Sequence, residues 1–334
     1  MSVPDVAATL LSPVAWRAPF APTAAVLALT AVFLSAVALP LATYTTALAL
    51  FGLAHVGSEL RYVDYRFGGR IRGGLAVWIL LPLAAAVMVR LAGMAGALPA
   101  TVGAGLELLL GAVMAVAAVT AMRQRRLAGA CVAAGLVAGA LVAPFQTLLL
   151  LAIAHNLTPL AFLADALAGA QRRRMLAAMS VPFVLLPLLI ASRLPQDLLS
   201  RIGLVDPEAM FLDGGALTAN MAIYVPMSVI DTSWALPMFS ASVFAQCMHY
   251  AAVILLLPRL IEPGRARPIA PWPNARRFAL YLAAAALMLA VGFVIDFKVA
   301  RQFYALAALV HAWVEIPILL LALDRGRGDR VTPG

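Results

Sequence analysis

All four histidines of this 334-residue chain lie inside long apolar segments. His55 is followed by Glu59 in the stretch FGLAHVGSELRYVDYR, and His311 is followed by Glu315 in VHAWVEIP. Residues four apart share one face of an α-helix, so each of these histidines has a carboxylate one turn away. An ionisable side chain at the centre of a membrane helix costs about 2.5 kcal/mol or more, and such residues usually serve a function. The pattern therefore predicts a single metal site.

The other two histidines, His155 and His249, complete the predicted ligand set. Neutral imidazole nitrogen binds iron, zinc or copper well, and helix bundles often place such ligands on facing helices. We expect the four histidines to bind the metal together with Glu315, which lies near the membrane midplane, where an unpaired carboxylate is most costly. Glu59 lies only two residues from Arg61, so we expect it to orient a ligand or to lie at the surface, and it is also a candidate catalytic residue.

Polar residues beside the histidines give further predictions. Tyr250, next to His249, is a candidate catalytic residue. Gln246 and Asn156 are candidates for binding substrate, although such residues also serve only to link helices. The histidines themselves have three alternatives to a metal site: haem ligation, a relay for protons or ions, and packing alone. Haem is disfavoured because paired axial histidines for two haems would be expected at two separate depths.

The composition shows what kind of protein must hold these side chains. The chain is 64% hydrophobic and 12% charged, with a mean hydropathy of +0.97. Soluble proteins carry about a quarter charged residues, so this composition is typical of a polytopic membrane protein. We expect one all-α transmembrane domain over residues 1–334, in a bacterial inner (plasma) membrane. The net charge of +9 does not indicate nucleic acid, because the arginines lie in short blocks between apolar runs.

Prolines and arginine clusters divide the chain into ten apolar segments that can each cross a bilayer. They are residues 23–39, 42–60, 74–93, 101–122, 127–143, 145–168, 175–192, 235–257, 278–296 and 302–323. Basic residues in short loops gather on the cytoplasmic side of a membrane. With ten segments, 19 of the 24 lysines and arginines fall on the side of the two termini. We therefore expect cytoplasmic termini and an outer connection, residues 193–234, that acts as a lid, a lateral gate or an ordered cap.

The stretch GLAH, in which Glu59 follows His55, resembles the first histidine motif of the Brp/Blh family of membrane-embedded β-carotene 15,15'-dioxygenases. In that motif G-x-x-H precedes an acidic residue. The resemblance covers this one motif and the layout of a polytopic chain with four intramembrane histidines. It implies a non-haem iron held by histidines, with His55 as a ligand, and cleavage of a carotenoid to retinal. The later three histidines match the family only by lying in the membrane.

Taken together, these patterns predict an integral membrane oxygenase or oxidoreductase with a non-haem iron (Fe2+) centre and O2 as co-substrate. Its substrate would be a lipid-soluble small molecule that enters from the bilayer, such as a carotenoid or another isoprenoid or lipid. Membrane lipids are the other expected partners, and nucleic acid is not one. Two alternatives stay open: a lipid oxidase with two metals, and a proton-coupled transporter that uses the same histidines and glutamates as a relay.

Overall fold

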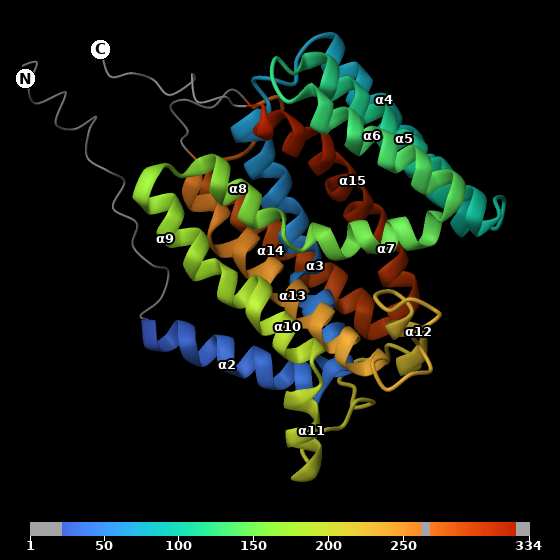
Figure 1. The fold of residues 1–334 in the computed structure, drawn as a ribbon, viewed down its shortest axis with the longest axis vertical. Helices are drawn as coiled ribbons and strands as arrows, with labels where there is room; N and C mark the ends of the chain where they lie inside the picture. Colours follow the sequence, from blue (N-terminus) through green and yellow to red (C-terminus); the bar gives the residue numbers. More distant parts are fainter. Residues whose placement is uncertain (1–21, 262–267, 325–334) are drawn as a thin grey trace, which may run out of the picture.

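The computed structural model describes residues 22–261 and 268–324, and within these ranges every regular element is a helix (Figure 1). The predicted positions of the two chain ends lie outside the described residues. The helices are α2 (Pro22–Ala38), α3 (Pro40–Phe67), α4 (Gly74–Met94), α5 (Ala100–Ala121), α6 (Arg126–Val142), α7 (Pro144–His155), α8 (Thr158–Ala166), α9 (Gly169–Ser180), the π-helix η1 (Val181–Leu185), α10 (Leu186–Ala191), α11 (Leu194–Arg201), α12 (Leu217–Met221), α13 (Ala235–Leu255), the 3-10 helix η2 (Leu257–Leu260), α14 (Ala275–Ile295) and α15 (Phe297–Leu323). The prediction of an all-α protein is confirmed.

Six helical stretches are long and apolar enough to cross a membrane, as expected for a multi-pass integral membrane protein. They are Gly74–Met94, Ala100–Ala121, Gly169–Ala191, Ala235–Leu260, Ala275–Ile295 and Phe297–Leu323. A seventh span is formed if α7 and α8, which bend by 46° at a short break, are taken together. The remaining predicted segments are helical as α2, α3 and α6, and the prediction of ten spans stays a prediction.

α3 is longer than the predicted segment 42–60, because it runs on to Phe67. The additional turns carry polar side chains that find partners in the segment leading into α14. The carboxylate of Asp64 accepts hydrogen bonds from two backbone N–H groups there and from Nε1 of Trp272, at 2.7 to 2.9 Å. These hydrogen bonds fix the polar C-terminal end of α3, and thereby the position of the helix that carries His55.

The predicted segment 145–168 is two helices instead of one. α7 ends at His155, and α8 begins after a two-residue gap with Pro159 in its first turn. A proline has no backbone N–H and fixes its own φ angle, which favours a helix start at this point. The side chain of Asn156, in the gap, donates a hydrogen bond to the backbone oxygen of Ala152 at 3.2 Å. A residue of the gap thus provides a partner for a backbone carbonyl at the end of α7. The break places His155 at a helix end.

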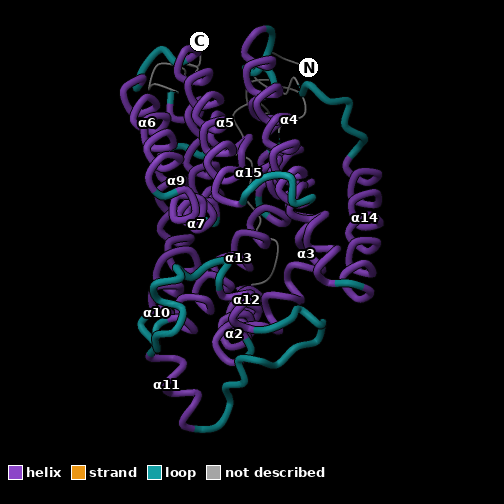
Figure 2. The backbone as a smooth tube through the Cα atoms, turned by 90° about the vertical axis from the view of Figure 1, so that its right-hand side faces the viewer, coloured by secondary structure: helices purple, strands orange, loops and turns teal. Residues whose placement is uncertain are grey.

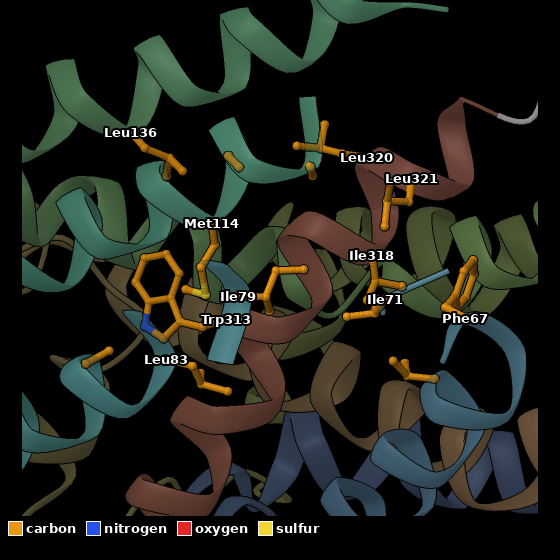
Figure 3. Packing of buried hydrophobic residues seen from close by; sticks show 14 of the residues in the cluster. Phe67, Ile71, Ile79, Leu83, Met114, Leu136, Trp313, Ile318, Leu320 and Leu321 are labelled. Atoms are coloured by element: carbon orange, nitrogen blue, oxygen red, sulfur yellow. The ribbon is translucent and has the colours of Figure 1, made fainter. Parts of the chain in front are cut away.

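Buried apolar side chains form two clusters, and the histidines lie where the clusters meet. One cluster joins α4, α5 and the second half of α15 around Trp313 (Figure 3). The other joins α2, the first half of α3, α10 and α13. On α3, Leu48 belongs to the second cluster and Tyr62 to the first, and His55 lies between them. On α13 the residues before His249 belong to the second cluster, and those after it are shared between the two, with Ala252 in the second and Val253 in the first.

The two faces of α15 have different tasks. Trp313 lies in the buried cluster between α15 and α5 (Figure 3). It packs against Gly111 of α5, where an added Cβ atom would overlap with Cζ3 of the indole. Only glycine lets the ring approach this closely. His311 and Glu315 lie two residues before and after Trp313, which places both on the opposite face of the helix. The indole therefore sets the rotation and depth at which α15 presents its histidine and glutamate.

The role of the connection over residues 193–234, as a lid, a lateral gate or an ordered cap, stays a prediction. α11 and α12 lie in the same half of the bundle, with α11 at its extreme end (Figure 2). Asn220 is fully buried there: its amide nitrogen donates to the backbone oxygen of Gly214 at 2.9 Å, and its amide oxygen accepts from Arg301 of α15 at 3.1 Å. The buried amide thus links the connection to α15.

Candidate metal centre

The structure brings the four histidines together from four helices: His55 from α3, His155 from the end of α7, His249 from α13 and His311 from α15. One ligand atom from each lies within 4.8 Å of the others. Nε2 of His311 lies 3.2 Å from Nε2 of His55 and 3.1 Å from Nε2 of His155. The prediction that the four histidines form one group is therefore confirmed.

The spacing of these nitrogens fits ligands of a metal ion. Imidazole nitrogens bind a metal at about 2.1 Å, so two of them on one ion lie about 3 to 3.4 Å apart. The two Nε2 distances to His311, 3.1 and 3.2 Å, fall in this range. His249 has both ring nitrogens buried without a hydrogen-bond partner, which is costly for a polar group unless it binds something else. The group could hold a metal on these grounds.

The carboxylate of Glu315 orients a histidine. One oxygen lies 2.6 Å from Nδ1 of His155, and the other accepts a hydrogen bond from the hydroxyl of Thr158 at 2.9 Å. A carboxylate oxygen accepts, so Nδ1 of His155 carries the proton. Nε2 of the same ring then keeps its lone pair and faces the other histidines. Carboxylates commonly fix metal-binding histidines in this way.

The carboxylate of Glu59 is placed differently. Its Oε2 lies 3.4 Å from Nε2 of His249, and neither of its oxygens has a hydrogen bond. Both residues are fully buried or nearly so. An unsatisfied carboxylate in an apolar interior is expensive, and a metal ion is one of the few ligands that offsets this cost. Glu59 is thus a better candidate for a direct ligand than its position near Arg61 indicated.

Tyr250 lies against the group from the side of α13. Its ring stacks on the His55 ring, with centroids 4.0 Å apart and planes 22° apart. Its hydroxyl receives a hydrogen bond from the Gln246 amide nitrogen and lies 3.0 Å from the hydroxyl of Tyr304. The amide oxygen of Gln246 accepts from the hydroxyl of Tyr224 at 3.1 Å. The ring of Tyr250 therefore contacts a histidine, while its hydroxyl belongs to a chain of hydrogen bonds that runs from Tyr224 through Gln246 to Tyr304.

The residues predicted to bind substrate are engaged with the protein. Both ends of the Gln246 amide are hydrogen-bonded, and the amide nitrogen of Asn156 is bound within its own helix turn. Two residues that the sequence reasoning missed complete the site, Thr158 and Tyr304. Tyr304 could have been found, because it lies seven residues before His311 and hence on the same helical face. Thr158 lies beyond the helix break, where no periodicity points to it.

No protein family, curated protein or solved structure matches this chain in comparisons.

Proposed function

We propose that the chain is an integral membrane oxygenase with a non-haem iron centre that oxidises a lipid-soluble substrate with O2. The observation that carries the proposal is the group of four histidines from four helices, with ligand atoms within 4.8 Å of one another, in the apolar interior of a membrane protein. A single intramembrane histidine is often a packing or relay residue. Four histidines that converge on one point share a function, and one metal centre would bind one nitrogen of each of them at once.

Within this proposal His55, His155, His249 and His311 hold the iron, and Glu59 is the carboxylate best placed to join them. Glu315 keeps His155 in the tautomer whose Nε2 can bind. A histidine-ligated iron ion with open positions supplies O2 binding and oxidation when it is bound. The protein supplies the rest: the two apolar clusters exclude water from the site, and the stacked ring of Tyr250 fixes the plane of His55.

Glu59 also has a chemical role open to it in this proposal. Its two oxygens are free of hydrogen bonds and lie beside His249. Such a carboxylate can accept a proton from a bound molecule at Oε2 when it is not a ligand. The resemblance of the His55 motif to carotenoid dioxygenases makes a carotenoid the first substrate to test, and other isoprenoids or unsaturated lipids follow. One ion and two close ions are both kept as alternatives in this proposal.

Metal analysis of the protein purified in lipid nanodiscs tests the proposal directly. We expect iron bound in a fixed ratio to protein, lost in His249→Ala and His311→Ala and kept in Cys247→Ala, a matched change on α13 outside the group. Retinal release and O2 consumption with β-carotene would identify the substrate class. A protein that stays free of metal after anaerobic incubation with Fe2+ contradicts the proposal.

The row of hydroxyl and amide groups from Tyr224 to Tyr304 favours a second candidate, a proton-coupled carrier. In that case the histidines and glutamates would pass protons, and metal would be dispensable. Proteoliposomes separate the two functions. Proton uptake by metal-free protein, abolished by Gln246→Leu, supports the carrier, whereas iron binding without proton movement supports the oxygenase.

The orientation in the membrane is part of the proposal. We infer ten spans with cytoplasmic termini and the connection, residues 193–234, on the outer face, because 19 of 24 basic residues then lie inside. Single cysteines placed near Arg259 and near Arg201 test the inference with a membrane-impermeant thiol reagent. Labelling of both from the same side would contradict it.

A further inference from the structure

One of the four histidines reaches the surface of the protein. His55, His249 and His311 are 1, 0 and 3% exposed. The side chain of His155 is 18% exposed, although its Nε2 lies 3.1 Å from Nε2 of His311. A molecule can therefore approach the group at His155 without any helix moving apart. Approach at the other three histidines would require the bundle to open.

The exposure of His155 follows from the break between α7 and α8. α7 packs on α5 and α6, whereas α8 turns away by 46° to pack on α13 and α15. No residue of α7 is buried, so the helix lies on the outside of the bundle and ends at the histidine. Interrupted membrane helices commonly form binding sites in transporters.

The surface around the break is apolar. No charged residue occurs between positions 147 and 164. Ile153 and Leu157, on either side of His155, are 39 and 40% exposed. In a span formed by α7 and α8 this surface faces acyl chains, because nothing else in the described chain covers it. A charged or strongly polar ligand would find no partner here apart from His155 itself.

We propose that the break between α7 and α8 is a lateral binding site, at which the acyl or isoprenoid chain of a bilayer-dissolved molecule reaches the histidine group beside His155. Ile153 and Leu157 form its rim. The site deepens the proposed function, on which its chemical purpose rests, by assigning the side from which the substrate comes. The end of the bundle at which Asn220 is buried is not the entrance in this proposal.

Photolabelling of metal-free protein tests the site without requiring that iron bind. The protein is placed in nanodiscs that contain a phosphatidylcholine with a diazirine at the middle of one acyl chain, and modified residues are identified by mass spectrometry. We expect carbene adducts on His155 and none on His55, His249 or His311. A charged, water-soluble diazirine should give no adduct on any of the four.

Bulky substitutions provide the matched comparison. Leu157→Trp and Ile153→Trp should each cover the break and lower labelling of His155 several-fold. Leu141→Trp, at a residue on α6 that is 75% exposed, should leave it unchanged. Circular dichroism and melting temperatures verify that the variants fold. No adduct on His155 from the acyl-chain probe, labelling of His155 only from water, or equal labelling of all four histidines would overturn the proposal. Failure of iron binding would instead count against the proposed function alone.

Discussion

α3 and α15 carry the same short pattern, a histidine followed four residues later by a glutamate, yet the structure uses the two carboxylates differently. On α3, Glu59 lies 3.4 Å from His249, and both of its oxygens lack hydrogen bonds. On α15, Glu315 is bound by His155 and by Thr158. Among the described residues, both carboxylates thus lie against a histidine of another helix, not against the one in their own pattern.

The difference shows what helical spacing can and cannot establish. A separation of four residues places two side chains on one face, and both pairs do face the same group. Whether a carboxylate is a ligand or orients one depends on the donors that other helices bring to it. Thr158 supplies such a donor to Glu315, and no described residue supplies one to Glu59. We infer that α3 contributes a ligand carboxylate and α15 an orienting one.

The largest effect is expected when each carboxylate loses its histidine. His249→Ala leaves Glu59 buried with no partner, and uncompensated buried charges cost about 3 to 5 kcal/mol. His155→Ala leaves Glu315 with its bond to Thr158, so the loss of stability should be smaller. Both variants should lose metal. Chemical denaturation in mixed micelles with Cys247→Ala as control measures the difference, and equal destabilisation by the two changes would remove the distinction between the carboxylates.

Glutamine at the two acidic positions tests the roles themselves. Glu59→Gln should abolish metal binding or strip one ion, because the amide is a poor substitute for an anionic ligand. Glu315→Gln should only weaken metal affinity or activity by about 10- to 100-fold, as is usual for a residue that orients a ligand. The sequence had favoured the reverse order. Competition with a chelator of known affinity gives both values, and iron loss in Glu315→Gln alone would restore that earlier order.

Much of the fold and the ligand set could be predicted because both depend on local pattern. Apolar runs of membrane length fix helices, and a histidine within such a run has few reasons to be there other than function. The pairing of Glu315 with His155 could not be predicted, because it depends on how far α7 extends before it breaks. The sequence from 145 to 168 is largely apolar on both sides of the break, so Pro159 is the main residue that indicates it.

The distances between the four histidines show the same limit. No pattern within one helix reports how four helices pack against one another. In the structure one ligand atom from each histidine lies within 4.8 Å of the others. The role of Tyr304 was missed for a related reason. Its contact with Tyr250 joins α15 to α13, and no pattern within either helix reports a contact between helices.

Substituting a glycine can shift the histidine–glutamate pair of one helix while leaving the two side chains themselves unchanged. Gly111→Ala should displace Trp313, rotate α15 and lower stability by about 1 to 3 kcal/mol, as overpacking typically does. Gly52→Ala is the counterpart on α3, where a Cβ would lie 2.9 Å from Cε2 of Tyr304, and its effect should be milder. Melting temperatures measure stability, and the spectrum of the bound iron reports geometry. A stronger effect from Gly52→Ala would mean that α3, not α15, is the more tightly placed helix.

The smallest effect is expected at Thr158, whose hydroxyl distinguishes the two carboxylates. Thr158→Val keeps the shape of the side chain and removes its hydrogen bond to Glu315. Such a bond contributes about 0.5 to 1.5 kcal/mol, so stability should fall by that amount. The remaining bond to His155 keeps the tautomer, so metal binding should persist at slightly reduced affinity. Thr101→Val, an exposed change on α5, is the control. Complete loss of metal in Thr158→Val would show that the hydroxyl does more than hold Glu315, because a group that acts only through the carboxylate cannot exceed the effect of Glu315→Gln.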